Sequence, residues 1–180
     1  MGIRNLKRAV FLDKDGVLNK VLIRDGKIGS PRNLRELELT EEALEPIDDL
    51  KKGGFLVVVL TNQPDLARGR MAFSEFEAMA RAVRERFPID DLLVCPHDDE
   101  DACECRKPKP GLIYRACEQH GIDVSRSFFV GDTRRDLEAA NRAGCPGLLI
   151  DTPYNRDVSC EHRFQNLRDA VKFILEQGDK

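Results

Sequence analysis

The chain lacks tryptophan, has few aromatic residues and carries no strong excess of either charge. Only 6% of its 180 residues are aromatic, and 29 Lys and Arg stand against 32 Asp and Glu, which gives a formal net charge of −3. This balance argues against nucleic acid or another polyanion as the main ligand. The longest apolar run, 55–60 (FLVVVL), has the length of a strand and not of a membrane span. We therefore expect neither a nucleic-acid nor a membrane partner.

The first residues, MGIRNLKRAVFLDKDG, become charged before the apolar core of a signal peptide could form, so we expect a cytoplasmic protein. The length suits one compact domain over 1–180, and no surplus amphipathic helix calls for a partner, so we expect a monomer. Six cysteines could form disulfides, but three of them lie with a histidine within 95–105. In the cytoplasm this clustering favours a metal.

Apolar, strand-like segments alternate with segments of helical pattern along the chain. Strands are expected at 7–12, 55–60, 92–94, 127–130 and 147–150, and helices at 41–52, 74–86, 110–120, 136–143 and 166–176. Ser74 and Glu77 have the spacing of a capping box at the start of the second helix. The alternation predicts an α/β fold with a doubly wound, Rossmann-like parallel sheet. The poorly patterned segment 17–39 is either a lid or, around Asp25-Gly26, a small hairpin.

Two carboxylates, Asp13 and Asp15, follow the first predicted strand, at the edge where an open α/β sheet binds its ligands. Carboxylates at this spacing can share a hard cation such as Mg²⁺. One of them can also attack an electrophile while the other transfers protons. Gly16 permits the unusual backbone that such a turn requires. An ordinary polar turn after a strand is the alternative explanation.

Further polar residues follow later strands. Thr61 directly follows the segment 55–60 and has a hydroxyl suited to phosphate oxygens. Lys107 precedes a proline that stiffens its loop. Asp132 and Asp136 follow the predicted strand at 127–130 and could complete a cation site or orient a lysine. The alternative explanations are a polar strand end for Thr61, a solvated basic loop for Lys107, and the capping of a helix N-terminus for Asp132 and Asp136. All these residues should converge on one edge of the sheet.

In chain order these groups resemble the motifs of the haloacid dehalogenase-like (HAD-like) phosphatase superfamily: Asp13-x-Asp15-Gly16-Val17, Thr61, Lys107 and Gly131-Asp132-x-x-x-Asp136. The resemblance implies a magnesium-dependent phosphatase in which Asp13 accepts the phosphoryl group. Asp15 would be the general acid and then the general base, while Thr61 and Lys107 would stabilise the phosphoryl group. Mg²⁺ would be held by Asp13, the backbone carbonyl of Asp15 and Asp132, with Asp136 in support.

The segment 95–105 reads Cys-x-His-x₅-Cys-x-Cys, with candidate ligands Cys95, His97, Cys103 and Cys105. Three sulfurs and one imidazole are a full tetrahedral Zn²⁺ set, and a closed set indicates a structural ion. Three incidental thiols are the alternative. This zinc loop, 95–105, leads directly into Arg106 and Lys107, so we expect the zinc ion to fix the direction of these two cations.

The zinc loop, the following RKPKPG and the TNQ at 61–63 resemble the heptose 1,7-bisphosphate 7-phosphatase family, whose compact members lack a large cap domain. The resemblance implies a small sugar phosphate as substrate, namely the 7-phosphate of D-glycero-D-manno-heptose 1,7-bisphosphate, with Arg106, Asn62 and Gln63 contacting it. Histidinol-phosphate phosphatases share much of the pattern and are the alternative. A phospho-acceptor receiver domain is disfavoured because its acceptor aspartate and acidic pair follow different strands. The residues VLIR at 21–24 depart from the family's Asp-His-Gly-Tyr, a loop that contacts substrate. The motifs therefore specify the phosphatase reaction more closely than they specify its substrate.

Overall fold

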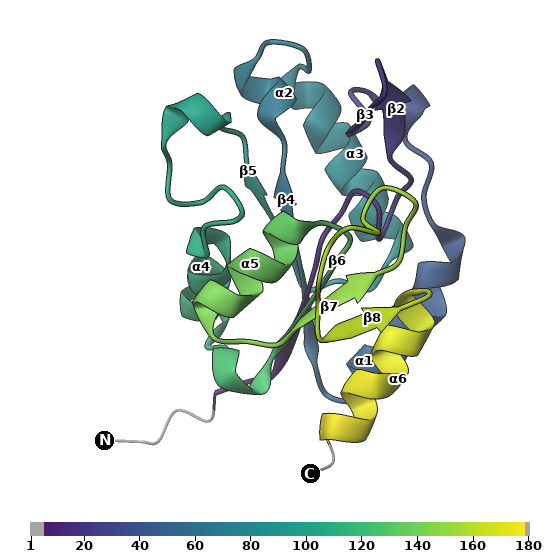
Figure 1. Cartoon of the computed structure of the whole chain (residues 1–180), viewed down its shortest axis with the longest axis vertical. Coiled ribbons are helices and arrows are strands. Elements are labelled where there is room, and N and C mark those ends of the chain that lie inside the picture. The colour runs from purple at the N-terminus through teal and green to yellow at the C-terminus, as the bar shows by residue number, and fades with distance from the viewer. Residues whose placement is uncertain (1–5, 179–180) are drawn as a thin grey trace.

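The computed structural model describes residues 6–178, so the first residues of the charged N-terminal stretch lie outside it. Six parallel strands form one sheet in the order β5-β4-β1-β6-β7-β8 (Figure 1). The strands are β1 (Ala9–Leu12), β4 (Leu56–Asn62), β5 (Asp91–Cys95), β6 (Phe128–Gly131), β7 (Gly147–Ile150) and β8 (His162–Phe164). The expected doubly wound parallel sheet is confirmed, while the short strand β8 was not predicted.

Helices cover both faces of this sheet: α1 (Leu44–Lys52), α2 (Pro64–Ala67), α3 (Phe73–Arg86), α4 (Gly111–His120), α5 (Arg134–Ala143) and α6 (Leu167–Gly178). Figure 1 shows α4 and α5 on one side of the sheet and α1 and α6 on the other. Short 3₁₀ helices lie at Leu34–Glu36, Glu41–Ala43, Asp99–Asp101 and Val124–Arg126. No helix between residues 6 and 178 combines the length and the apolar character of a membrane crossing.

Strand β1 supplies side chains to both layers of the core because successive strand residues point to opposite faces. Val10 and Leu12 join the cluster that includes residues of α1, α3 and α6. Ala9 and Phe11 join the cluster that includes residues of α4 and α5. All four side chains are completely buried. The continuous apolar runs of the sequence therefore reflect central strands that are covered on both faces.

Helix α3 does not begin with the predicted capping box. Its N-cap is Ala72, which has extended backbone (φ −72°, ψ 146°) and gives no side-chain hydrogen bond, so Ser74 is already the second helical residue. The helix starts earlier at Phe73, whose ring packs against that of Phe76 with centroids 6.2 Å apart. A serine three residues before a glutamate marks a helix start only when the serine lies outside the helix.

The segment 17–39 contains the small hairpin that the sequence allowed. Strands β2 (Leu22–Arg24) and β3 (Lys27–Gly29) pair antiparallel. The turn between them has positive φ at Asp25 (51°) and Gly26 (71°), as a tight hairpin turn requires. The hairpin is followed by Ser30, which reaches the candidate site.

A buried asparagine holds the loop after β7 against the carboxyl ends of two strands. The amide nitrogen of Asn155 donates to the carbonyl oxygens of Asp132 (2.7 Å) and Ile150 (2.8 Å). Its amide oxygen accepts from the backbone N–H of Thr152 (3.1 Å) and from Arg163 (3.0 Å). The side chain is 1% exposed, so these partners have no water to replace them.

Replacing Asn155 by alanine is expected to lower the free energy of unfolding by about 2–4 kcal/mol, because buried carbonyl groups lose their donors. Urea denaturation followed by circular dichroism measures this change. Asn141→Ala removes the same side chain at an exposed position and should change stability by about 0.5 kcal/mol or less. Equal stability of the two variants would contradict the role assigned to Asn155.

Candidate active site

The carboxyl ends of β1, β4 and β6 meet where the order of the sheet reverses, which is where open α/β sheets bind ligands. Asp13 follows β1, and Asp132 follows β6. A cavity of about 500 Å³ opens here, and its lining includes Asp13, Asp15, Lys107, Asp132 and Asp136. The structure thus brings together, in one cavity, residues that lie far apart in the sequence.

A buried ammonium group joins two of these carboxylates. Lys107 Nζ lies 2.8 Å from Asp13 Oδ1 and 2.7 Å from Asp136 Oδ1, and it donates to the carbonyl of Leu60 at 2.9 Å. Burial alone would lower the pKa of Lys107, but the two carboxylates outweigh it and raise that pKa above its usual value. Lys107 is therefore a fixed positive charge at the floor of the cavity.

Three carboxylates, those of Asp13, Asp132 and Asp136, lie within 4.8 Å of one another. Burial and the charge of Asp136 raise the pKa of Asp13 to about 7, although Lys107 opposes this shift. Burial and the charges of Asp13 and Asp136 likewise raise the pKa of Asp132. Oxygen Oδ1 of Asp132 is buried without a hydrogen-bond partner. Such a cluster of carboxylate oxygens carries excess negative charge, and one of its buried oxygens has no hydrogen-bond partner. Both features suit a hard divalent cation such as Mg²⁺, which prefers oxygen ligands.

The approach of the first turn to Asp132 requires a glycine. Gly16 has φ +88°, and a Cβ atom placed on it would lie 1.9 Å from Asp132 Oδ2. The same carboxylate oxygen accepts a hydrogen bond from the hydroxyl of Tyr154. Gly16 thus leaves room for a carboxylate whose one oxygen is fixed by Tyr154 while the other remains free.

Asp15 is held by four donors and is not one of the three clustered carboxylates, although it lines the same cavity. Its Oδ1 accepts from Lys14 (2.6 Å) and Asn19 (2.9 Å), and its Oδ2 accepts from Ser30 (2.7 Å) and Gln63 (2.8 Å). Burial alone would raise the pKa of Asp15, but the charge of Lys14 and these hydrogen bonds outweigh it and lower that pKa. Asp15 is therefore an ionised, tightly positioned carboxylate.

Of the three neighbouring residues predicted to contact phosphate or substrate, Thr61, Asn62 and Gln63, only Asn62 lines the cavity. Thr61 and Gln63 are completely buried, and Gln63 donates to Thr61 Oγ1 (3.0 Å) as well as to Asp15. Gln63 therefore supports Asp15. Neither Thr61 nor Gln63 is among the described residues that line the cavity, and their expected contacts with phosphate and substrate stay predictions. Asn62 does line the cavity, but its amide is paired with the backbone N–H and carbonyl of Lys107, both at 3.1 Å.

Arg106 lines the cavity, as expected for a residue that contacts substrate. Its guanidinium donates to Asp99 Oδ1 at 2.8 Å and to the carbonyl of His97 at 3.2 Å. Arg24, in the segment 21–24 that departs from the family pattern, donates to the carbonyl of Ser30 and pairs with Glu36. This pairing holds Arg24 within its own loop.

Asp136 both caps a helix and supports the cluster. Its Oδ2 accepts from the backbone N–H (3.0 Å) and hydroxyl (2.6 Å) of Thr133, the N-cap of α5, while its Oδ1 pairs with Lys107. Capping and support of the site, which the sequence offered as alternatives, are therefore combined in one side chain.

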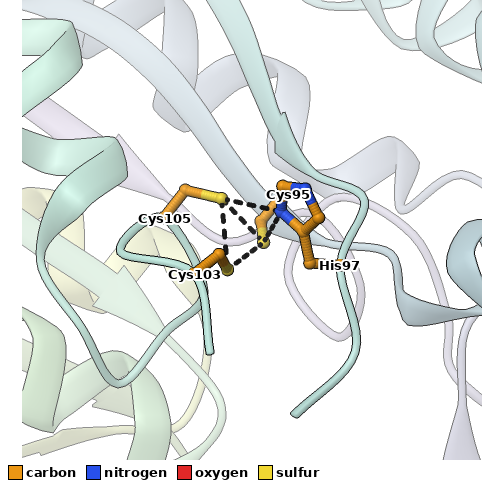
Figure 2. A group of neighbouring side chains, drawn as sticks. All are labelled: Cys95, His97, Cys103 and Cys105. Carbon is orange, nitrogen blue, oxygen red and sulfur yellow. Dashed lines mark hydrogen bonds between the residues drawn. The ribbon is translucent and has the colours of Figure 1, made fainter. Parts of the chain in front are cut away.

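The side chains of Cys95, His97, Cys103 and Cys105 converge on one point (Figure 2). The three sulfur atoms lie 3.0–3.6 Å apart, and His97 Nδ1 lies 3.3 Å from Cys105 Sγ and 3.7 Å from Cys95 Sγ. Zn²⁺ at about 2.3 Å from each sulfur needs sulfurs about 3.8 Å apart in a tetrahedron. This side-chain cluster is therefore compatible with a zinc site that needs only a small expansion.

Several residues of the site carry no recognisable sequence signal. Lys14 lies between two aspartates and is completely buried, although a lysine in a turn normally predicts exposure. Asn19, Ser30 and Tyr154 reach the carboxylates from loops with no fixed motif spacing. Their roles depend on contacts between distant segments, which the sequence pattern does not report.

Comparison with known proteins identifies relatives of similar length. The Hydrolase_like family, described as HAD-hydrolase-like, matches residues 104–172. The D-glycero-beta-D-manno-heptose-1,7-bisphosphate 7-phosphatase of Pseudomonas aeruginosa is 38% identical over 148 residues, which cover 79% of this chain and 80% of that protein. The Helicobacter pylori enzyme of the same name is 30% identical and covers 93% and 99%. The D-glycero-alpha-D-manno-heptose-1,7-bisphosphate 7-phosphatase of Campylobacter jejuni is 29% identical and covers 94% and 97%.

Solved structures that superpose on this chain include phosphatases of the same kind. The D,D-heptose 1,7-bisphosphate phosphatase of B. bronchiseptica, solved with magnesium and phosphate, superposes with a TM-score of 0.81 at 28% identity and covers 94% of this chain and 99% of that one. A HAD-like phosphatase from Mesorhizobium loti gives a TM-score of 0.74 at 29% identity and covers 98% and 91%. The chain belongs to the HAD-like hydrolases, in the family of the heptose-1,7-bisphosphate 7-phosphatases.

Proposed function

We propose that this HAD-like hydrolase removes the 7-phosphate of D-glycero-D-manno-heptose 1,7-bisphosphate through a phosphoryl group carried on Asp13. The observation that carries the proposal is the buried contact of Lys107 with both Asp13 and Asp136 at the floor of the cavity. A carboxylate beside a fixed ammonium can approach an anionic phosphate with reduced repulsion. The names of the relatives support the choice of sugar phosphate.

The proposed reaction has two displacements at phosphorus. A carboxylate oxygen of Asp13 attacks, the bond from phosphorus to the sugar oxygen breaks, and Asp15 protonates the leaving alkoxide. Asp15 then takes a proton from water, which attacks phosphorus, releases inorganic phosphate and regenerates Asp13. The incoming phosphate adds negative charge near Asp15 and so favours the protonated form that the first step needs. Because the transition state is loose, positioning and charge stabilisation supply most of the rate.

The remaining residues of the site position these two carboxylates. Lys107 fixes Asp13, while Lys14, Asn19, Ser30 and Gln63 fix Asp15. Thr61 is proposed to stabilise the transferred phosphoryl group together with Lys107. Gln63, which we expect beside the phosphate, also supports Asp15. Arg106 and Asn62 are proposed to face the substrate from the cavity wall.

We propose that Asp13, Asp132 and the backbone carbonyl of Asp15 hold a catalytic Mg²⁺ ion, with Asp136 in support. The unpartnered buried Oδ1 of Asp132 and the clustered carboxylates fit such an ion. Bound Mg²⁺ would neutralise charge on the transferred phosphoryl group. The relative from B. bronchiseptica was solved with magnesium and phosphate, which supports this assignment.

We also propose that the zinc loop holds a structural Zn²⁺ and that residues 1–180 form one phosphatase domain without a large cap, working as a monomer in the cytoplasm. A closed set of three thiolates and one imidazole supports the structural role of zinc. The near-complete coverage of the Helicobacter pylori relative supports the single domain.

Asp13→Asn is expected to reduce phosphate release by about 10⁴-fold or more, because an amide is a poor nucleophile and cannot replace the carboxylate. A malachite-green assay measures the released phosphate. Asp25→Asn makes the same change at an exposed hairpin turn and should keep full activity. If Asp13→Asn keeps the melting temperature of the wild type and also turns over at a comparable rate, the nucleophile lies elsewhere.

Metal analysis by inductively coupled plasma mass spectrometry should find about one Zn²⁺ per chain, since one tetrahedral set is present. The double variant Cys103→Ser/Cys105→Ser should lose it, whereas Cys160→Ser, outside the zinc loop, should retain it. After treatment with EDTA that removes the weakly held cation, Mg²⁺ alone should restore activity. Retention of zinc by the double variant, or recovery that requires Zn²⁺, would overturn the division between the two metals.

The substrate is tested by comparing kcat/KM for three compounds in the presence of Mg²⁺. These are the α and β anomers of heptose 1,7-bisphosphate, for which different relatives are named, and histidinol phosphate. We expect at least about a tenfold advantage for one heptose anomer, which corresponds to about 1.4 kcal/mol of transition-state binding. A preference for histidinol phosphate would replace the proposed substrate, and equal weak turnover of all three would remove it.

A further inference from the structure

Two arginines from different elements hold one carboxylate at the wall of the cavity. Arg106, which follows the zinc loop, contacts Asp99 with Nε to Oδ1 at 2.8 Å and Nη2 to Oδ2 at 3.4 Å. Arg135, in the first turn of α5, contacts the same two oxygens at 3.0 and 3.3 Å. All three residues line the cavity that contains Asp13 and Lys107.

The two guanidinium groups come from different elements of the fold. Arg106 is buried, with its side chain 10% exposed, and its second contact is the carbonyl of His97 in the zinc loop. Arg135 lies on α5, the helix that also carries Asp136. Asp99 itself is 57% exposed and stands in a single 3₁₀ turn, Asp99–Asp101. Arg106 is thus anchored by a contact besides Asp99, whereas Arg135, with its side chain 46% exposed, is positioned by α5 and by its contacts with Asp99. The exposed carboxylate between the two arginines can turn outward into water.

A carboxylate held by two guanidinium groups occupies the place that a phosphate group would occupy, because both anions match the planar fork of arginine. Without Asp99, the two arginines would present two positive charges to the cavity. With Asp99 in place, one of these charges is compensated. The neighbouring Lys107 is already neutralised by its own carboxylates, so this pair is a separate place for negative charge.

Arg106 is already expected to contact the substrate. We propose that Arg135 joins it in an anion subsite for a second phosphate group of the substrate, and that Asp99 occupies this subsite in the free protein as an internal competitor. Asp99 is then a specificity-determining residue, because a substrate must carry a group that displaces it. The inference rests on the proposed function for the identity of the substrate, a sugar bisphosphate. The subsite itself is defined by the contacts of Asp99 alone.

The test measures binding and does not depend on turnover. Isothermal titration calorimetry compares fructose 1,6-bisphosphate with fructose 6-phosphate on the zinc- and magnesium-loaded full chain in an Asp13→Asn background. The readout is the ratio of the two dissociation constants, monophosphate over bisphosphate. Asp99→Asn should raise this ratio by about twofold to tenfold, as expected when two partly exposed ion pairs are exchanged for contacts with a phosphate. Arg135→Gln should lower it by a similar factor.

Glu100→Gln is the matched control, since it removes one negative charge from an exposed position in the same 3₁₀ turn. It should leave the ratio unchanged. A ratio that is unchanged or lowered in Asp99→Asn, or one that rises equally in Glu100→Gln, would overturn the inference. If the ratio moves as expected while no heptose bisphosphate is hydrolysed by the unmutated protein, the proposed substrate fails and the anion subsite stands. If the unmutated protein hydrolyses heptose bisphosphate but the ratio does not change as expected, the proposed substrate stands and the anion subsite fails.

Discussion

The burial of one ammonium group among carboxylates is the constraint on which the rest of the site depends. Lys107 is 3% exposed, and taking its charge out of water is costly unless each donor finds an acceptor. Asp13, Asp136 and the Leu60 carbonyl supply these acceptors from three different segments. The positions of β1, β4 and α5 therefore all depend on contacts with Lys107 Nζ. Displacement of any of these elements would leave the buried charge without one of its acceptors.

Two further devices hold Lys107 in this position. The amide of Asn62 pairs with both polar groups of the Lys107 backbone and so fixes the loop to the end of β4. On the N-terminal side, the converging thiols and imidazole of the zinc loop end directly before Arg106. Asp15 is positioned independently by donors from its own turn, from the segment after the hairpin and from Gln63, which directly follows β4. The nucleophile and the acid–base group of the proposed reaction are thus fixed by separate sets of contacts.

The sequence predicted every strand of the central sheet except β8, and most helix positions, because these depend on local periodicity, which a single chain displays. It also placed Asp13, Asp132 and Lys107 at one edge, since the carboxyl ends of parallel strands lie together. It could not predict the buried Lys14 or Asn155, whose partners are set by how distant loops pack. The same limit applies to the contact of Gln63 with Asp15, which joins two segments that lie far apart in the sequence. Ser74 shows the reverse error, in which a local pattern was present but the helix began before it.

The alternation of side chains along β1 has a consequence for how this chain can change in length. Val10 and Leu12 serve one layer of the core, Ala9 and Phe11 serve the other, and Asp13 follows directly. Inserting or deleting one residue here would exchange the two faces and turn Asp13 away from the cavity. Such changes should therefore be absent from β1 during evolution. Asp25 and Gly26 are exposed at the turn of the hairpin, so insertions and deletions between homologues should accumulate there instead.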